Sequence, residues 1–542
     1  MAKGAFQNEF TYKTFVEHGR ESEFHKLFEN AIASVKAEFG KTYPIYIGDE
    51  EVTCGALLEE RSPVDNSIVI GRFQKGTARE AIKAIEVAKH SFESWKETDY
   101  RDRAAIFSKF ADLVSKNKFT LAAALSYENA KSVYESIGEV DEAIDFARYY
   151  VMEIIRNKGY IRKTSLQKSS ANVSAGFQGA PSESEKVAIA MKPYGVFGVI
   201  APFNFPVSIS MGMSIGAMIT GNTVVFKPSS TDNMTMLVEL MLYKLLREAG
   251  LPSGVFNYVT GAGSDVGNEL VMNKDTAGIA FTGSRSTGMG MISKCFASGL
   301  QKVFVVEMGG KNPAIVSRHA DIDAAVKGVA SAAFGFAGQK CSALSRVYVD
   351  ERIKELFISK LIEKVRSMKV GNPLDRDIYM GPLISGSAYE KYKKAVETIK
   401  NTGKLLYGGN RLDVGLNGYY VEPVLAELPH SSDIVHNELF VPILAIVGYK
   451  NFDEALSMAN DTSYGLTAGL YSKNRKEIKQ FSRSIEAGVV YINRSISATT
   501  GAIVGLHTFV GWKGSALTGK GSGSTYYLPQ FMREQSLSIT EG

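Results

Sequence analysis

Short apolar runs alternate with longer amphipathic stretches between residues 187 and 306. A continuous apolar run is typical of a strand buried on both faces, and apolar positions three and four residues apart are typical of a helix. The runs predict strands at residues 196–200, 223–226, 255–259, 278–281 and 302–306. Strands that alternate with helices indicate a parallel, doubly wound sheet, which binds ligands beyond the carboxyl ends of its strands.

Two further regions extend this α/β pattern. From Gly309 a second α/β unit follows, with helices predicted at residues 354–369, 389–402 and 453–461. Residues 76–155 have charged and apolar positions at helical spacing, which predicts surface helices of a larger body. Residues 1–50 predict an amphipathic helix followed by a short strand. Between Lys163 and Lys186 the composition shifts to Ser, Ala, Gln and Gly, which favours a loop or an arm.

One apolar segment, from Val207 to Phe226, has about the length that a transmembrane helix needs. Gly221 and Asn222 divide it into a helix rich in Gly, Met and Ser and a short strand. Prolines lie at both ends, and no asymmetry of Lys and Arg frames it. We expect a buried helix followed by a buried parallel strand, and therefore no membrane association.

Charge and cysteine content narrow the function classes. The 62 Lys and Arg residues exceed the 57 Asp and Glu residues by 5, and they form no basic stripe of the kind that binds nucleic acid. Cys54, Cys295 and Cys341 are too few and too scattered for a disulfide framework or a zinc site. The first ten residues lack the apolar core of a signal peptide. We expect no metal and a cytoplasmic protein, since a reducing compartment preserves a working thiol.

Cys341 lies in a Gly-broken turn between a small, apolar helix and a strand. Such a turn can expose a side chain to a cleft and direct backbone N–H groups beside it. Only the thiolate attacks carbon, and the adjacent Lys340 is a candidate to favour it. A lone cysteine is more often a small buried hydrophobe. Other residues must therefore support a catalytic role.

Two stretches upstream supply that support. Glu307 ends an apolar strand where the chain breaks into Gly309 and Gly310, and a carboxylate there can act as a general base. Asn204 lies between an apolar strand and a proline, and an amide in so stiff a turn is a plausible oxyanion donor. A thiol, a carboxylate and an amide are the three parts that a thioester mechanism needs.

At these residues the sequence resembles the aldehyde dehydrogenase family over nearly its whole length. Five family motifs occur in the expected order: Ala201-Pro-Phe-Asn-Phe-Pro206, Lys227-Pro-Ser-Ser230, Phe281-Thr-Gly-Ser-Arg-Ser-Thr-Gly288, Glu307-Met-Gly-Gly-Lys311 and Gly338-Gln-Lys-Cys341. The resemblance implies an NAD(P)-dependent oxidation of an aldehyde to a carboxylate. Cys341 would be the nucleophile, Glu307 the general base and Asn204 the oxyanion donor.

The resemblance also implies a cofactor site. Asn437-Glu-Leu-Phe-Val-Pro442 stands where the family has a second cofactor motif, with Asn437 and Val441 departing from the usual residues. Ser230 stands where strictly NAD-using relatives often have a glutamate, so we expect both NAD and NADP to bind. Gly514 to Gly521 nearly matches a P-loop but lacks its Ser or Thr. The implied cofactor residues are Ala201, Phe203, Lys227, Ser229, Ser230, Gly263, Gly283, Ser284, Glu438 and Phe440.

Within the family the chain is most similar to the 1-pyrroline-5-carboxylate dehydrogenase branch, from its leader segment and from Ser342 after the nucleophile. The implied substrate is glutamate γ-semialdehyde, and its implied contacts are Phe205, Ser342, Gly501 and Ala502. Glyceraldehyde or succinic semialdehyde remains open as the substrate, as does a nucleotide-binding relative without activity. Glu307 argues against relatives that transfer the acyl group to coenzyme A.

The resemblance implies three parts of the chain. A dinucleotide-binding domain would comprise residues 1–165 and 190–308, and a catalytic domain residues 309–505. Residues 166–189 and 506–542 would form a small β arm that adds strands to a partner subunit. We therefore expect a homodimer or a higher homo-oligomer.

Overall fold

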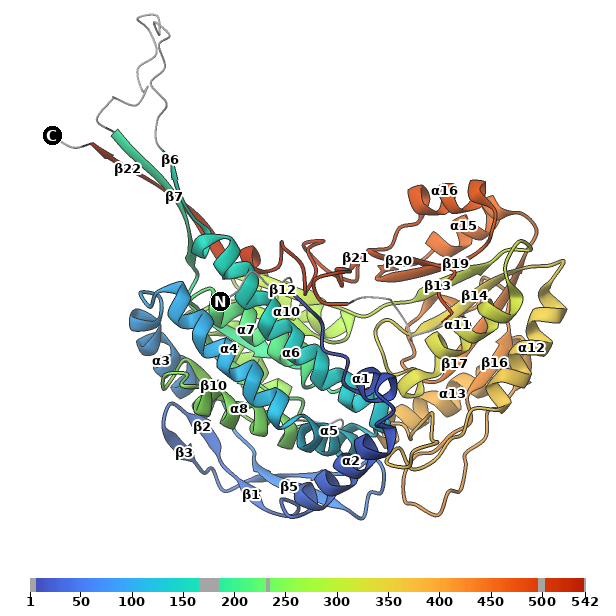
Figure 1. Ribbon diagram of the computed structural model, residues 1–542, viewed down its shortest axis with the longest axis horizontal. Coiled ribbons are helices and arrows are strands. Elements are labelled where there is room, and N and C mark those ends of the chain that lie inside the picture. The colour runs from blue at the N-terminus through green and yellow to red at the C-terminus, as the bar shows by residue number, and fades with distance from the viewer. Residues whose placement is uncertain (1–5, 165–184, 231–233, 496–502, 541–542) are drawn as a thin grey trace, which may run out of the picture.

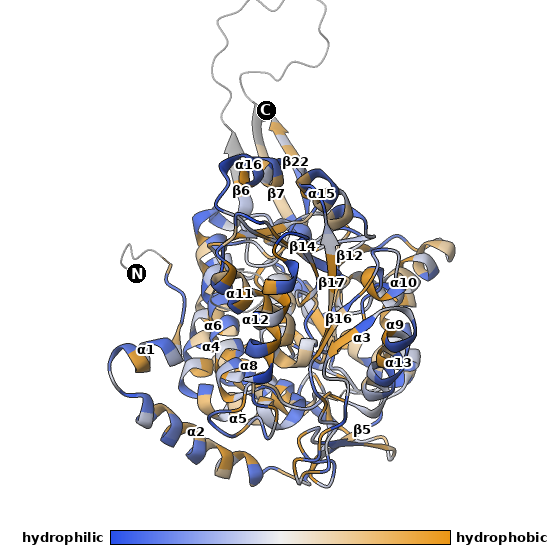
Figure 2. Ribbon diagram, turned by 90° about the vertical axis from the view of Figure 1, so that its right-hand side faces the viewer, coloured by the Kyte–Doolittle hydropathy of each residue, from blue (hydrophilic) through white to orange (hydrophobic). Residues whose placement is uncertain are grey.

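The computed structural model describes residues 6–164, 185–230, 234–495 and 503–540. Two seven-stranded sheets, each covered by helices, lie side by side, and a three-stranded sheet projects from the first body (Figure 1). No helix of the described residues is long and apolar enough to cross a membrane. Figure 2 shows that the surface helices carry both hydrophobic and hydrophilic positions, as amphipathic helices do.

The first sheet has the order β12-β11-β8-β9-β10-β2-β3, and its first five strands are parallel. The α/β prediction is confirmed. The sequence did not predict that a hairpin from near residue 45 extends the sheet antiparallel to β10. The strands are β12 (Val303–Glu307), β11 (Thr276–Thr282), β8 (Val196–Ile200), β9 (Thr223–Lys227), β10 (Phe256–Tyr258), β2 (Ile45–Ile47) and β3 (Glu50–Val52).

Helices cover both faces of this sheet because alternate strand residues point to opposite sides. Val224 and Phe226 enter one core, and Val225 enters the other. The first core is formed with α2 (Glu21–Lys36), α4 (Tyr100–Lys116), α5 (Lys118–Asn129), α6 (Val133–Arg156), α7 (Ser208–Ile219) and α8 (Leu237–Ala249). The second core includes α3 (Ala78–Trp95), α9 (Asn268–Met272) and α10 (Arg285–Ala297). As expected, residues 207–226 divide into the buried helix α7 and the buried parallel strand β9.

The second sheet has the order β15-β16-β17-β14-β13-β19-β20 and is parallel except for β15. Its strands are β15 (Lys404–Tyr407), β16 (Val424–Glu427), β17 (Ile443–Tyr449), β14 (Leu344–Asp350), β13 (Asn312–Val316), β19 (Thr467–Tyr471) and β20 (Val489–Ile492). Its helices include α11 (Ile322–Phe334), α12 (Lys354–Arg366), α13 (Gly386–Thr402), α14 (Asp433–His436), α15 (Phe452–Asn460) and α16 (Arg475–Ser484).

Three smaller sheets complete the fold. Two of them are β1-β5-β4, from β1 (Thr42–Tyr43), β5 (Val69–Gln74) and β4 (Leu57–Arg61), and β18-β21, from β18 (Tyr464–Gly465) and β21 (Trp512–Lys513). The projecting sheet has the order β22-β7-β6, from β22 (Met532–Thr540), β7 (Glu185–Pro193) and β6 (Ile161–Thr164). Before β22 the chain returns to the first body, where Tyr527 and Phe531 enter its core. Between Gly521 and β22 the described residues form only a short 3₁₀ helix, Leu528–Phe531, so no α-helix starts at the end of residues 514–521 as a P-loop requires.

Candidate active site

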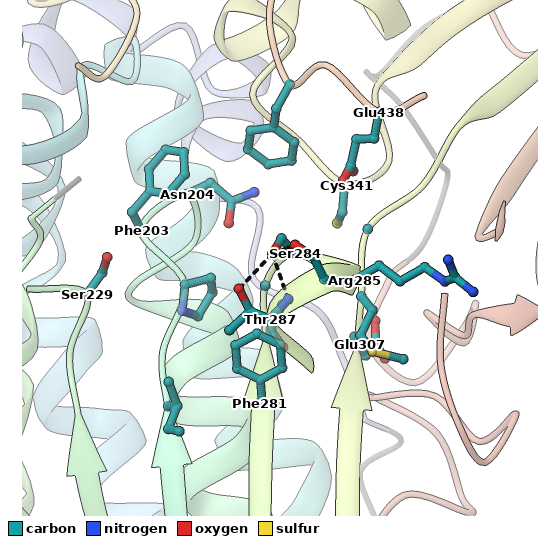
Figure 3. Close-up of a pocket in the computed structure, with 18 of the residues that line it drawn as sticks. Phe203, Asn204, Ser229, Phe281, Ser284, Arg285, Thr287, Glu307, Cys341 and Glu438 are labelled. Carbon is teal, nitrogen blue, oxygen red and sulfur yellow. Dashed lines mark hydrogen bonds between the residues drawn. The ribbon is translucent and has the colours of Figure 1, made fainter. Parts of the chain in front are cut away.

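A cavity of about 880 Å³ lies between the two sheets, at the carboxyl ends of the parallel strands of the first one. Residues after β8, β9, β11 and β12 line one side, and the turn before β14 lines the other. Figure 3 shows the side chains of Asn204, Glu307 and Cys341 facing the same space. Three residues distant in sequence therefore meet in one cavity.

The turn before β14 presents Cys341. After α11, the residues Phe336, Ala337 and Gly338 have φ values of 51°, 53° and 68°, which reverse the chain. Asn312 Nδ2 then donates to the Cys341 carbonyl at 2.8 Å. A Cβ atom on Gly310 would lie 2.4 Å from that carbonyl oxygen, so glycine is required for this close approach. The nucleophile's backbone is thus held from two directions.

The charged groups around the Cys341 thiol do not favour its thiolate, contrary to what the sequence position of Lys340 led us to expect. Lys340 Nζ pairs with Glu135 Oε1 at 2.6 Å, so its charge is compensated away from Cys341. Burial raises the pKa of the Cys341 thiol, and the carboxylates of Glu307 and Glu438 raise it further. The expectation that Lys340 favours the thiolate is therefore corrected.

Glu307 is the last residue of β12. Its side chain is part-exposed to the cavity, but the surrounding protein raises its pKa to about 8, because burial disfavours the charged carboxylate. The next amide, Met308 N–H, donates to the Ser515 carbonyl at 2.8 Å. The C-terminal segment therefore holds the end of β12 in place. A carboxyl group with this pKa can exchange a proton near neutral pH.

Asn204 lies in the loop between β8 and α7, with 4% of its surface exposed. Its amide Nδ2 donates to the Gln339 carbonyl at 3.1 Å, two residues before Cys341. An amide has two N–H bonds, so the second one is available to an oxyanion. This contact links the loop of the candidate oxyanion donor to the turn of the nucleophile.

The opposite part of the cavity suits a dinucleotide. The buried Lys227 donates to Ser230 Oγ at 3.2 Å, and burial lowers the Lys227 pKa to about 8. Ser284 caps α10 by accepting the Thr287 N–H at 3.2 Å (Figure 3), and no acidic residue lies in the first turn. Free N–H groups at such a helix start bind phosphate. All ten predicted cofactor residues line this cavity, which therefore fits the group.

Two of those ten cofactor residues, Glu438 and Phe440, come from the second sheet, in the segment between β16 and β17. Glu438 Oε1 accepts the Gly310 N–H at 2.9 Å, and burial raises the Glu438 pKa to about 7. Phe440 has a left-handed φ of 62°, and its ring meets the Phe203 ring edge-on with centroids 5.8 Å apart. The two rings contact each other where they line the cavity.

The predicted substrate residues are placed less completely. Phe205 and Ser342 do not line this cavity, and Gly501 and Ala502 lie outside the described residues. Two cations that line the cavity had no assigned role, Arg285 at the start of α10 and Lys391 on α13. Arg285 stands within the quoted cofactor turn, so its position was a usable signal. Lys391 belongs to an ordinary amphipathic helix, and nothing local marks it.

Among the described residues, one group of possible metal ligands lies outside the cavity. His430, His436 and Asp461 offer ligand atoms within 4.8 Å of one another. The Arg346 guanidinium donates to the Asp461 carbonyl at 3.2 Å and to Tyr348, which contacts His430. The positive charge of Arg346 would repel a metal cation bound to these three residues. The hydrogen bond between the His430 ring and the Asp461 carboxylate explains why these side chains lie together.

Comparison with known proteins agrees with this geometry. The model of the Aldehyde dehydrogenase family matches residues 52–537. The chain is 35% identical over 521 residues to the 1-pyrroline-5-carboxylate dehydrogenase of Geobacillus sp. (strain WCH70), covering 95% of this chain and 96% of that protein. It is 36% identical over 516 residues to the 1-pyrroline-5-carboxylate dehydrogenase 2 of Bacillus subtilis (strain 168), covering 94% and 95%.

A solved structure is similar along the full length. The 1-pyrroline-5-carboxylate dehydrogenase from Thermus with bound NAD superimposes with a TM-score of 0.89 at 34% identity, covering 100% of both chains. Fold, motif order and site geometry agree with a match over most of the sequence. The chain belongs to the aldehyde dehydrogenase family.

Proposed function

We propose that the protein oxidises glutamate γ-semialdehyde, the open form of 1-pyrroline-5-carboxylate, to glutamate with NAD as the hydride acceptor. The observation that carries the chemistry is the convergence of Cys341, Glu307 and Asn204 on one cavity. The near full-length relatives named 1-pyrroline-5-carboxylate dehydrogenase support the substrate.

The chain's own residues account for the steps. The Cys341 thiolate attacks the aldehyde carbon, and the Asn204 amide and the Cys341 N–H hold the resulting oxyanion. NAD, when bound, would supply the hydride acceptor, and loss of hydride from the tetrahedral adduct leaves Cys341 as a thioester. Glu307 takes a proton from water, and the hydroxide displaces the thiolate and releases the carboxylate. Water, aldehyde and NAD give carboxylate, NADH and two protons.

NAD would be held by residues that follow strands of the first sheet and by Glu438 and Phe440, which lie between β16 and β17 of the second. Lys227 and Ser230 would hold the adenosine ribose, and the amides at the start of α10 would hold the diphosphate. Glu438 would bond the nicotinamide ribose, and Phe440 would pack near the nicotinamide ring. Ser230 carries no charge to repel a 2′-phosphate, so we propose that NADP also serves.

The assignment of the wider molecule is part of the proposal. The arm of β6, β7 and β22 would join subunits into a homodimer or a higher oligomer, in a cytoplasmic enzyme. The dinucleotide-binding domain, catalytic domain and arm would otherwise follow the boundaries proposed from the sequence, with β6 and the whole of β7 counted in the arm. Phe205, Ser342, Gly501 and Ala502 would contact the substrate.

A direct assay tests the substrate. NADH formation is followed with 1-pyrroline-5-carboxylate and, in parallel, with propionaldehyde, glyceraldehyde and succinic semialdehyde. We expect the highest kcat/KM for 1-pyrroline-5-carboxylate, because only that substrate offers an α-carboxylate and an amine. A kcat/KM no better than that for propionaldehyde would overturn the substrate. Absence of turnover with every aldehyde would leave a nucleotide-binding protein.

A further inference from the structure

A buried ion pair lies directly behind the loop that carries Asn204. Lys131 stands between α5 and α6, Glu139 lies on α6, and the two side chains are 1% and 0% exposed. Neither residue lines the cavity. A buried ion pair is weak support for stability, since apolar residues of similar volume often do as well. The contacts of this pair indicate another reason for its presence.

The pair holds both ends of residues 204–208. Lys131 Nζ donates to the Asn204 backbone carbonyl at 2.6 Å and to Glu139. Glu139 Oε1 accepts the N–H groups of Val207 at 2.8 Å and Ser208 at 3.3 Å, at the start of α7. One cation and one anion therefore complete the backbone hydrogen bonds on either side of this short loop.

The same ammonium group contacts the nucleophile's side of the site. Lys131 Nζ lies 3.5 Å from the centroid of the Phe205 ring and 4.9 Å from that of Phe336. Phe336 begins the left-handed turn before Cys341. Cations bind ring faces at such distances. Lys131 thus bridges the loop of the oxyanion donor and the turn of the nucleophile.

We propose that Lys131 and Glu139 are positioning residues that fix the Asn204 amide relative to Cys341. The inference rests on the proposed role of Asn204 as oxyanion donor. A side-chain amide binds an oxyanion well only when its position is set before the reaction, and a displacement of about 1 Å can cost about 100-fold in rate. The pair acts through Asn204 and contacts neither substrate nor cofactor.

The test compares Lys131→Met, Asn204→Ala and the two changes combined. We expect Lys131→Met to slow single-turnover NADH formation by about 100-fold, while the dissociation constant for NAD stays within about threefold. In the Asn204→Ala background, Lys131→Met should slow the reaction by less than about threefold, because the group it positions is gone. A purely structural role would not produce this non-additivity.

Two further variants separate folding from positioning. Lys131→Met combined with Glu139→Gln removes both charges, so that no uncompensated charge stays buried, and it should show the same kinetic loss. Lys118→Met is the matched control. Lys118 is also buried between helices, but it binds Glu9 and Thr11. It should leave the rate of hydride transfer within about twofold of wild type.

The outcomes are distinguishable. The positioning role alone is overturned if the rate loss of Lys131→Met adds fully to that of Asn204→Ala. It is also overturned if the Lys131→Met, Glu139→Gln double variant has the wild-type rate. Wild-type hydride transfer in Asn204→Ala overturns the oxyanion assignment, and with it the proposed reason for the ion pair.

Discussion

Cys341 depends on backbone contacts for its position and on the cavity for its reactivity. Its carbonyl is held by Asn312, and Gly310 leaves room for that approach. Burial raises the pKa of its thiol, so most of the thiol is protonated at neutral pH. The rate of attack should therefore increase with pH.

Cys341→Ser tests the nucleophile. A serine hydroxyl is a far weaker nucleophile than a thiolate near neutral pH, so we expect kcat to fall by about 1,000-fold or more, about 4 kcal/mol in barrier. NAD binding, measured by titration, should be unchanged. Cys295→Ala is the control, because Cys295 is buried within α10 and does not line the cavity. Turnover of the serine variant within about tenfold of wild type would refute the role of Cys341.

Glu307 predicts a pH dependence with a definite sign. A general base works only when ionised, and burial raises the Glu307 pKa to about 8. Below that value the rate of thioester hydrolysis should rise about tenfold per pH unit, and above it the rate should level off. The measurement is deacylation from single-turnover kinetics between pH 6 and pH 10. A rate independent of pH across this range would exclude Glu307 as the base.

Glu307→Gln provides the matching variant. A glutamine keeps the shape of the side chain and cannot take a proton, so the first hydride transfer should survive while hydrolysis stalls. We expect a burst of NADH followed by slow turnover without an inflection near pH 8. Loss of the burst together with the steady state would point to a different role.

Ser230 determines our expectation for the cofactor. Its hydroxyl is fully buried, donates to the Gly261 carbonyl and accepts from Lys227. A glutamate there would repel a 2′-phosphate by about 4 kcal/mol before screening, for charges about 4 Å apart. The wild-type enzyme should use NAD and NADP with kcat/KM values within about 100-fold, and Ser230→Glu should favour NAD. A preference for NAD above about 10⁴ in the unmodified enzyme would show that Ser230 does not decide it.

At the scale of elements, the turn between α11 and β14 sets the nucleophile's geometry. Gly338 has a φ of 68°, and a Cβ there would lie 2.7 Å from the Val441 carbonyl oxygen. Val441 follows Phe440, so this contact joins the nucleophile's turn to the second cofactor motif. The close approach is possible only for glycine.

Gly338→Ala should therefore disturb both stability and catalysis. The left-handed conformation costs about 1–2 kcal/mol for alanine, and the clash with backbone adds to it. Gly415→Ala is a matched control, since Gly415 has a φ of 74° but no atom within 4 Å of a Cβ. In denaturant unfolding, both variants should have a lower free energy of unfolding because of the left-handed alanine. Gly338→Ala should have the larger decrease, and only this variant should also have a lower kcat. Equal losses in the two variants would contradict the packing argument.

At the scale of the whole molecule, the arm stands away from the body that supplies its strands (Figure 1). Leu537 and Ile539 on β22 are 50% and 49% exposed, although β22 pairs with β7 along its length. Exposed apolar side chains on an open sheet edge favour pairing with another chain. Such a surface fits the proposed subunit contact.

Leu537→Glu combined with Ile539→Glu tests that contact. Charges on an apolar subunit contact oppose association, so we expect light scattering to report a smaller species than wild type. Leu356→Glu is the control, because Leu356 is 51% exposed on α12 in the second body. An unchanged mass for the arm variant, or a monomeric wild type, would rule out this role of the arm.

The sequence by itself determined the α/β class, the parallel strands from residue 196 to residue 307 and the motifs that line the cavity. These features depend on local patterns. Buried parallel strands appear as continuous apolar runs, and glycine breaks mark their ends. Asn204 after β8 and Glu307 at the end of β12 followed from the same patterns, so their meeting at one edge of the first sheet was predictable. Cys341 precedes β14 of the second sheet, and its place opposite them depends on how the two sheets pack.

Only the tertiary structure decided which distant side chains meet. Asn204 bonds Gln339 across 135 residues of sequence, and Lys131 bonds Asn204 across 73. Lys340 binds Glu135, which lies 205 residues away in the sequence, although Cys341 is its sequence neighbour. No local pattern encodes such contacts, because they depend on strand order and on how α6 packs against α7. Pairing and burial, which set the charges and pKa values of this site, are properties of the assembled layers.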